Sequence, residues 1–290
     1  MPYSAGGSLD TIGRSVAEGM GRALGVPMIV DNRTGASGAI GAATAARAVP
    51  DGRTLLLGGS STHAVLPAAS PKLPYDAVAD FTPISMIAEV ENALVVGPTL
   101  PVNSVSELVA YCKARPGQLA FGSSGAGGIT HLAGELFKIA AGVDAIHVPY
   151  KANSEVDLAL LSGQLQFAFA TLATAIPHIR AGRMRALALA SAQRSAFLPA
   201  LPTTSEAGFP SIIAVSWAAL YGPAKMDSAH ITRLNAAVQT SLKRPELKTR
   251  FNAIVTRALG STPEELTEYQ KRDHARWSRV VQAAGIKLES

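Results

Sequence analysis

Three segments of the chain combine glycines with hydroxyl side chains, a composition suited to binding an anion. They lie at residues 2–10, 58–63 and 122–131. Backbone amides left accessible by glycine and serine or threonine hydroxyls can donate to a carboxylate without a buried cation. A hydrogen bond to a charged group contributes about 1.5 to 3 kcal/mol, so a handful suffices for micromolar binding. The three segments together predict an anion site, although each alone is equally typical of a turn.

The first segment reads Pro-Tyr-Ser-Ala-Gly-Gly-Ser-Leu-Asp and leads into a predicted helix. Its apolar positions recur at helical spacing until Gly25 ends the helix: Leu9, Ile12, Val16, Met20 and Leu24. The first N–H groups of a helix are unpaired and carry the positive end of its dipole. We therefore expect the amides of this loop to point outward toward an anion.

Catalytic templates fit the sequence poorly. The serines of the second and third segments do not lie in a Gly-x-Ser-x-Gly elbow, and the chain has neither a phosphate-binding loop nor a dinucleotide turn. The six histidines show no metal-ligand spacing, so we expect no metal and no cofactor. An acyl-transfer enzyme using Ser123 or Ser124 with His131 is the alternative to a binding protein. A domain that binds only other proteins is a third possibility.

Length and composition predict a globular protein of two lobes. The chain has 290 residues, of which 48% are hydrophobic and 16% charged. Its net charge of +5 is spread over single lysines and arginines, which argues against nucleic acid and suits a small anion. The single cysteine, Cys112, excludes an intrachain disulfide. The sequence contains no apolar stretch long enough to span a bilayer and no signal peptide.

Short apolar runs alternate with helical segments along the chain, which predicts the α/β class. The runs are continuous rather than alternating, which is typical of parallel strands covered on both faces. Strands are expected at 28–30, 54–58, 81–88, 93–96, 119–121, 146–148, 165–169 and 184–190, with an extended stretch at 212–221. Ser104 with Glu107 forms a capping box, and Asp227 and Thr262 begin further helices.

Prolines near residues 98 and 223 mark two crossings between lobes. We expect one lobe at residues 1–98 and 223–290 and the other at 99–222, with two connecting strands and a ligand cleft between the lobes. In open α/β sheets, ligands bind at the carboxyl ends of the strands, where the glycine loops lie.

Several spaced motifs resemble the substrate-binding proteins of tripartite tricarboxylate transporters, the Bug-type family. They include the opening Pro-Tyr-Ser-Ala-Gly-Gly-x-x-Asp, Val30-Asp31-Asn32-Arg33, Gly122-Ser123-Ser124-Gly125 with His131, and His147-Val148-Pro149-Tyr150-Lys151. The resemblance covers nearly the whole chain. It implies a type II periplasmic-binding-protein fold and a monomeric periplasmic receptor. Such a receptor closes on a small carboxylate, di- or tricarboxylic or aromatic, and delivers it to membrane transporter subunits.

The resemblance also implies which residues contact the ligand. In the family, the first loop and a loop of the second lobe hold one carboxylate through backbone amides and waters. The matching positions here are Tyr3, Ser4, Ala5, Gly6, Gly7, Asp10, Ser60, Ser61, Thr62, Ser123, Ser124, Gly127, Gly128, Thr130, His131 and Thr171.

Two departures from the family pattern carry expectations. Many members have an aspartate where this chain has Ala170, and such a carboxylate could pair with a ligand ammonium, so amino acids are disfavoured as ligands. Relatives also have a signal peptide and a first strand before the glycine loop, whereas only Met1 precedes Pro2 here. We expect that the loop needs such a strand to precede it.

Overall fold

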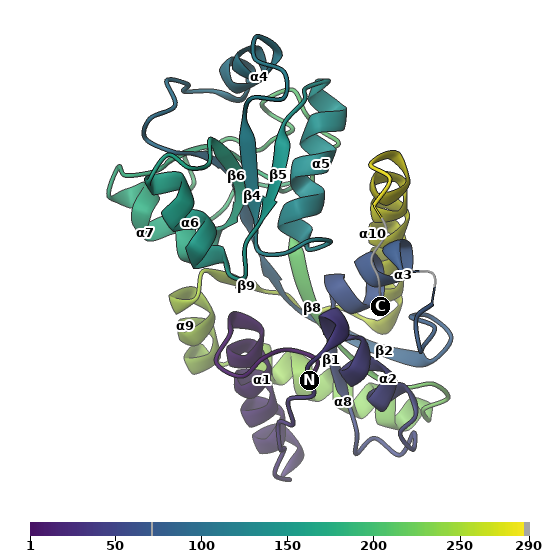
Figure 1. Cartoon of the computed structure of the whole chain (residues 1–290). Coiled ribbons are helices and arrows are strands. Elements are labelled where there is room, and N and C mark those ends of the chain that lie inside the picture. Colours follow the sequence, from purple (N-terminus) through teal and green to yellow (C-terminus); the bar gives the residue numbers. More distant parts are fainter. Residues whose placement is uncertain (71, 287–290) are drawn as a thin grey trace. The chain divides into compact units, whose positions relative to one another are not determined.

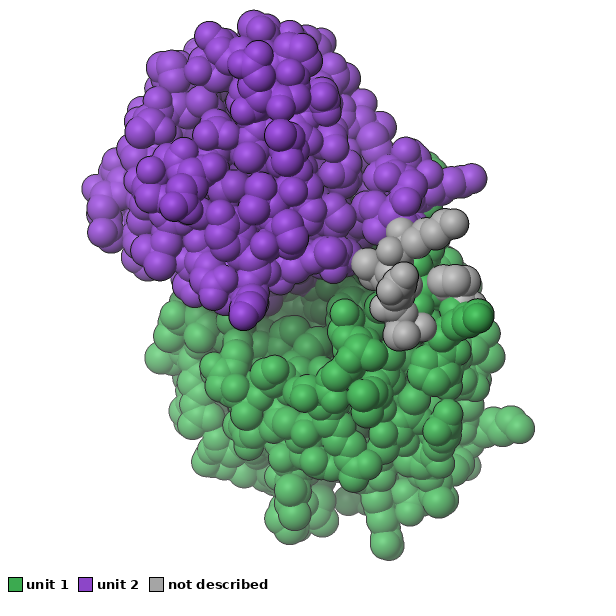
Figure 2. Space-filling model, in the orientation of Figure 1, with its two compact units in different colours: residues 1–89, 217–279, 287–290 green, residues 90–216, 280–286 purple. Residues whose placement is uncertain are grey.

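The computed structural model describes residues 1–70 and 72–286, which form two compact units (Figure 2). Unit 1 contains residues 1–89 and 217–279, and unit 2 contains residues 90–216 and 280–286. Each unit combines one sheet with helices. The predicted two-lobed α/β fold is confirmed.

Unit 1 is built on a four-stranded sheet of order β1-β8-β2-β9. Its aromatic core includes Trp217 and Tyr221 of β8 and Trp277 of the last helix, all almost fully buried. The indole Nε1 of Trp217 donates to Asp273 over 2.7 Å. The elements of the unit are α1 (Ser8–Leu24), η1 (Ala36–Gly38), α2 (Ala39–Ala46), β1 (Leu56–Gly59), η2 (Ser61–Val65), α3 (Leu66–Ala69), β2 (Phe81–Val90), β8 (Ser216–Pro223), α8 (Ser228–Leu242), α9 (Pro245–Ala253), β9 (Thr256–Ala258) and α10 (Pro263–Ala283).

Unit 2 is built on a five-stranded sheet of order β5-β4-β6-β3-β7. Figure 1 shows α5 on one side of this sheet and α6 with α7 on the other. Phe121, Phe137 and Phe167 pack together at its centre, with ring centroids 5.5 to 5.6 Å apart. The elements are β3 (Asn92–Val96), α4 (Val105–Lys113), β4 (Ala120–Ser123), α5 (Ile129–Ala141), β5 (Ile146–Pro149), α6 (Asn153–Leu161), β6 (Phe167–Thr171), α7 (Leu172–Arg180) and β7 (Arg185–Leu189).

The sheet of unit 2 is mixed rather than mostly parallel, with two parallel and two antiparallel pairings. In unit 2, β4 runs parallel to β5 and β6, but β3 runs antiparallel to both β6 and β7. In unit 1, β1 and β8 are antiparallel. All five residues of β3 are buried. Its continuous apolar run therefore reports burial on both faces, which an antiparallel strand in the middle of a covered sheet experiences equally.

The chain passes between the units earlier than the prolines suggested. The changes occur at residues 89–90 and 216–217, and the last turn of α10 belongs to unit 2. Gly97 and Pro98 instead follow β3, which is already a strand of the unit 2 sheet. Proline marks the end of that strand rather than the passage between units.

Residues 28–30 do not form the expected strand. They have no regular secondary structure, no ladder includes them, and Ile29 is 91% exposed. A strand needs a neighbour, and residues 28–30 have none in the described part of the chain. None of the helices described is long and apolar enough to cross a bilayer.

Candidate functional site

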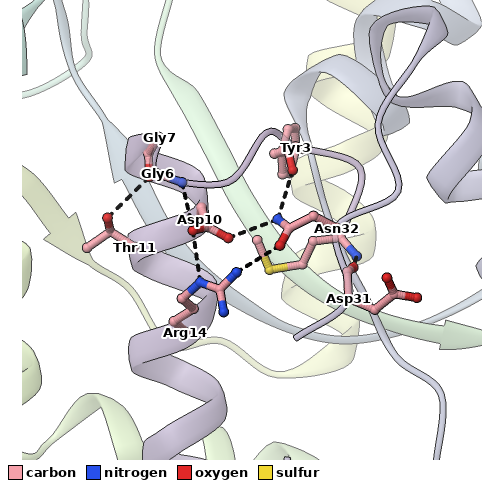
Figure 3. A network of polar contacts seen from close by, with 9 residues as sticks. Tyr3, Gly6, Gly7, Asp10, Thr11, Arg14, Asp31 and Asn32 are labelled. Carbon is pink, nitrogen blue, oxygen red and sulfur yellow. Dashed lines mark hydrogen bonds and ion pairs between the residues drawn. The ribbon is translucent and has the colours of Figure 1, made fainter. Parts of the chain in front are cut away.

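The first glycine loop is tied to helix α1 by a polar network centred on Asp10 (Figure 3). Asp10 Oδ2 accepts hydrogen bonds of 2.9 Å from the Gly6 N–H and from Arg14 Nε, and Oδ1 accepts from Asn32 Nδ2 over 2.9 Å. The Asn32 amide also donates to the Tyr3 carbonyl, 2.9 Å away, and accepts from Arg14 Nη2 over 2.8 Å. The network joins both ends of the loop to one buried carboxylate.

This network corrects the expected orientation of the loop amides. The Gly6 N–H points inward to Asp10 instead of outward, and Asp10 is only 4% exposed. The bond from Arg14, with those from Gly6 and Asn32, lowers the pKa of Asp10 to about 2, so the carboxylate is ionised at neutral pH. The stretch Ser4–Gly7 is exposed, the first-turn amides of α1 have no acceptor within the helix, and Asp10 fixes the loop that carries them.

Tyr3 of the first segment lies against the second segment, residues 58–63. A Cβ added at Gly59 would lie 2.2 Å from the Trp217 carbonyl oxygen, so the backbone of β8 requires glycine there, and the Tyr3 hydroxyl would lie 3.0 Å from the same Cβ. Burial raises the pKa of Tyr3, against hydrogen bonds to Ser61 and Thr62 that lower it. Tyr3 and the half-exposed Ser61 thus form one polar spot on unit 1.

Two of the three hydroxyl residues expected to bind ligand at 60–62 are buried. The Thr62 side chain is fully buried, where its Oγ1 accepts from the Gly59 N–H over 3.1 Å and lies 2.9 Å from His63 Nδ1. Ser60 is 5% exposed. Residues 61–65 form a single π-helical turn, which directs Thr62 into the unit.

In unit 2, the third segment, residues 122–131, is built like the first glycine loop. It connects β4 to α5, and Gly125 and Gly127 have positive φ values of 130° and 74°. The Gly127 N–H donates to His131 Nδ1 over 2.9 Å. Burial lowers the pKa of His131 to about 4, so the ring is neutral and Nδ1 is free to accept.

The two loops share one geometry. In each, a glycine with positive φ donates its N–H to the side chain four residues later, on the first turn of the following helix: Gly6 to Asp10 and Gly127 to His131. Gly7 and Gly128 follow as extended N-cap residues. In each loop, the acceptor side chain, Asp10 or His131, holds the glycine in place. The other amides at the N-terminus of the helix do not bond to that side chain.

Ser123 contacts His147, not the His131 named in the acyl-transfer alternative. Its Oγ lies 2.7 Å from His147 Nε2 and 3.0 Å from the Gly125 carbonyl, and its side chain is almost fully buried. His147 stacks on His131 with ring centroids 3.7 Å apart. The acyl-transfer alternative pairs Ser123 or Ser124 with His131, but in the structure Ser123 Oγ contacts His147 and His131 Nδ1 accepts from the Gly127 N–H.

The remaining predicted residues gather at one edge of the unit 2 sheet. Strands β4 and β6 are parallel neighbours, so their carboxyl ends, at Ser123 and Thr171, meet there. Ser124 donates its N–H to Thr130 Oγ1 over 3.3 Å, and Thr171 Oγ1 donates to Asn92 Oδ1 over 3.1 Å. Ser124 and Thr171 stay partly accessible, whereas Thr130 is buried.

Three residues that shape these loops carried no predicted role. Arg14 and Asn32 hold Asp10, and His147 holds Ser123. The spacing of four residues between Asp10 and Arg14 on a helix was a usable signal. Asn32 and His147 come from distant parts of the chain, so only the fold reveals their contacts. The described residues include no group of acids, histidines and cysteines that could hold a metal ion.

The chain is similar in sequence to a known protein family. Residues 12–286 match the model of the tripartite tricarboxylate transporter family receptor. The chain is 36% identical over 290 residues to protein BugT of Bordetella pertussis, covering 100% of this chain and 89% of that protein.

Two solved structures with named ligands are similar throughout. The R. palustris protein Rpa4515 with adipate is 34% identical with a TM-score of 0.84, covering 99% of this chain and 96% of that one. MatC from Rhodopseudomonas palustris with bound malate is 30% identical with a TM-score of 0.80, covering 97% and 96%.

Proposed function

The chain belongs to the tripartite tricarboxylate transporter receptor family, and we propose that it captures a small carboxylate with donors from its glycine loops. The family consists of solute receptors and not enzymes, which removes the acyl-transfer alternative. The observation that carries the proposal is the repeated loop geometry, in which Asp10 and His131 each fix a glycine loop before a helix. Fixed amides at helix N-termini favour an anion without a buried cation.

The named relatives narrow the proposed ligand. The Rpa4515 structure holds adipate and the MatC structure holds malate, both dicarboxylates. We take a dicarboxylate as the first candidate here, ahead of tricarboxylates and aromatic acids. In unit 1, the proposed contacts are Tyr3–Gly7 and Ser61. In unit 2, they are Ser124, Thr171 and the amides of Gly125, Ala126 and Ile129, because the Gly127 and Gly128 N–H groups already donate to His131 and to the Gly125 carbonyl. As a family receptor, the protein is proposed to act in the periplasm and to deliver its ligand to transporter subunits.

Thermal unfolding with a ligand panel tests the proposal. Adipate, malate, citrate and benzoate are each added at millimolar concentration, with adipamide as the matched uncharged control for adipate. A ligand present at 100 times its Kd stabilises the folded state by about 2.7 kcal/mol, a shift of a few degrees. A shift with at least one carboxylate and none with adipamide supports the proposal. No shift with any of them contradicts it.

Ala170 supports a further restriction on the ligand. It lies on β6, directly before Thr171, and is 3% exposed, so this position supplies no carboxylate for an ammonium group. Glutarate and glutamate form a matched pair that differs only by an α-ammonium group. We expect glutarate to bind more tightly. Tighter binding of glutamate would reject this restriction while leaving the receptor function intact.

A further inference from the structure

Asn92, the first residue of β3, is fully buried in unit 2 and contacts a proposed ligand residue. Its Nδ2 donates to the Ala214 carbonyl over 2.7 Å, and its Oδ1 accepts from Thr171 Oγ1 over 3.1 Å. Asn92 and Thr171 lie directly opposite each other on the antiparallel strands β3 and β6. One buried amide therefore joins a backbone carbonyl to a threonine at the edge of the sheet.

The Ala214 carbonyl determines which way round the Asn92 amide lies. A carbonyl oxygen can only accept, so the amide group that faces it is the NH₂. The reverse orientation would bring two acceptor oxygens together between two fully buried residues. The Ala214 N–H donates to the Ala190 carbonyl over 2.8 Å, and the Ala190 N–H donates to the Asn92 carbonyl over 2.9 Å. These backbone bonds hold the Ala214 carbonyl, and with it the amide, in place.

The orientation of the Asn92 amide in turn fixes the hydroxyl of Thr171. Asn92 Oδ1 has no hydrogen to give, so Thr171 is the donor in the bond between them. A hydroxyl group has one hydrogen and two lone pairs, and the hydrogen of Thr171 is already used. Toward any other group, Thr171 Oγ1 can only accept.

Helix α7 does not use the lone pairs of Thr171. Thr171 is the N-cap residue of α7, a position where a threonine hydroxyl commonly accepts from an N–H of the first turn, yet its side chain makes no such bond. Leu172, the first residue of the helix, instead donates its N–H to the Glu91 carbonyl over 2.8 Å. Thr171 is half-buried, at the carboxyl end of β6. Its oxygen is therefore left as an acceptor for a ligand at this edge of the sheet.

We infer that Asn92 is a positioning residue that makes Thr171 an acceptor, and that the ligand presents a hydroxyl group to it. This positioning role rests on the proposed carboxylate site and narrows the ligand class to a hydroxy-substituted dicarboxylate. An ionised carboxylate has no hydrogen to donate, so it would set acceptor against acceptor at Thr171. An ammonium group could donate, but the neighbouring Ala170 offers no carboxylate to balance its charge. A neutral hydroxyl group donates and needs no counter-charge.

Matched pairs of acids test the hydroxyl group by calorimetry at neutral pH. The pairs are malate and succinate, 2-hydroxyglutarate and glutarate, and 2-hydroxyadipate and adipate, with each hydroxy acid measured as separate enantiomers. We expect one enantiomer of a hydroxy acid to bind at least about fivefold more tightly than its parent, the usual worth of one added hydrogen bond. Equal binding within every pair contradicts the inference and leaves the carboxylate proposal intact. Binding of none of these acids also contradicts it, and citrate and benzoate then show whether the carboxylate proposal survives.

Two substitutions of Thr171 test whether its oxygen accepts from the ligand. Thr171→Val removes the hydroxyl and should reduce the preference for the hydroxy acid over its parent at least about fivefold. Thr171→Ser supplies an oxygen at the same place and should restore the preference. If Thr171 instead donated to a ligand carboxylate, Thr171→Val would weaken both members of a pair equally. A preference that persists in Thr171→Val overturns the inference.

Substitutions of Asn92 test the positioning role itself. Asn92→Leu keeps a side chain branched at Cγ but removes the amide, so the Thr171 hydrogen becomes free to point at the ligand. We expect the preference for the hydroxy acid to fall at least about threefold. Asn92→Asp is the matched control, because a buried, protonated carboxyl group donates to Ala214 and accepts from Thr171 as the amide does, so the preference should remain. An unchanged preference in Asn92→Leu would show that Asn92 does not set it. If circular dichroism shows that Asn92→Leu does not fold, the Thr171 variants decide.

Discussion

At the scale of single residues, one buried carboxylate and one buried neutral imidazole perform the same task in the two units. Asp10 and His131 each accept the N–H of a glycine in a left-handed conformation. Asp10 can do so as an ion because Arg14 and Asn32 surround it, whereas His131 accepts as a neutral ring. The loops therefore depend on side chains that need not touch the ligand themselves.

Removing the Asp10 acceptor should cost ligand affinity more than stability. Asp10→Ala releases the Gly6 N–H and leaves Arg14 and Asn32 without their common partner. We expect the Kd for the best carboxylate, measured by calorimetry, to rise at least about tenfold, which corresponds to about 1.4 kcal/mol. Asp10→Asn keeps one acceptor oxygen, so its Kd should lie between those of the unaltered protein and Asp10→Ala. Wild-type affinity in Asp10→Ala would show that the network does not position the loop.

Buried histidines should make the protein less stable in mild acid. Burial lowers the pKa of His63 to about 3 and those of His131 and His147 to about 4. The unfolded chain, with histidines near 6.5, takes up protons first, so this stability is present above pH 6.5 and lost as the pH falls toward 4. His63 stacks on Tyr221 with centroids 3.9 Å apart, so His63→Phe preserves a ring there. Between pH 7.5 and 5.0, the free energy of unfolding measured with denaturant should fall by about 2 kcal/mol less in His63→Phe than in the unaltered protein. An unchanged loss would mean that His63 is not kept neutral by burial.

At the scale of elements, the glycine loops tolerate side chains unequally. Gly6 has φ 82°, whereas Gly7, its neighbour, has φ −80°. A Cβ at Gly6 would meet nothing within 4 Å, so any penalty comes from the backbone and not from a clash. An L-residue in the left-handed region costs about 1 to 2 kcal/mol.

Alanine substitutions at Gly6 and Gly7 separate the effect of backbone strain from the effect of an added side chain. Gly6→Ala should weaken carboxylate binding about tenfold by calorimetry, because the loop relaxes away from the geometry that Asp10 holds. Gly7→Ala is the matched control and should change the Kd less than about threefold, since its φ is ordinary and the nearest atom, the Ser4 carbonyl oxygen, would lie 3.6 Å away. Equal effects of the two variants would contradict this account.

Local signals in the sequence predicted the helices well, because capping is a short-range property. Helix α1 ends at Gly25, which has φ 72°, and the Ser104 side chain accepts from the Glu107 N–H over 3.1 Å as the capping box requires. Strand direction and the absent ladder at residues 28–30 were not predictable in this way, because both depend on neighbours far along the chain. The same limit applies to the site: the loops were found from their glycines, but the buried orientation of Thr62 was not.

At the scale of the whole molecule, the two units differ in how the chain builds them. In unit 1, every neighbouring pair in the order β1-β8-β2-β9 joins a strand from residues 1–89 with one from residues 217–279. In unit 2, all five strands come from the continuous stretch 90–216. The colours in Figure 1 show the same contrast. Strands β1, β2 and β8 have colours from distant parts of the sequence, whereas β4, β5 and β6 have similar colours.

This difference predicts that one unit folds alone and that neither half of the other does. Residues 90–216 hold a complete five-stranded sheet with helices on both sides and the Phe121, Phe137 and Phe167 core, so the fragment should unfold cooperatively in urea. Residues 1–89 contain β1 and most of β2, whose sheet neighbours β8 and β9 begin at residue 216 or later, so that fragment should show no cooperative transition. Circular dichroism through urea titrations of both fragments measures this directly. A cooperative 1–89 fragment would mean that its strands can pair without the C-terminal segment, and a non-cooperative 90–216 fragment would mean that unit 2 depends on residues 280–286 or on unit 1 for its stability.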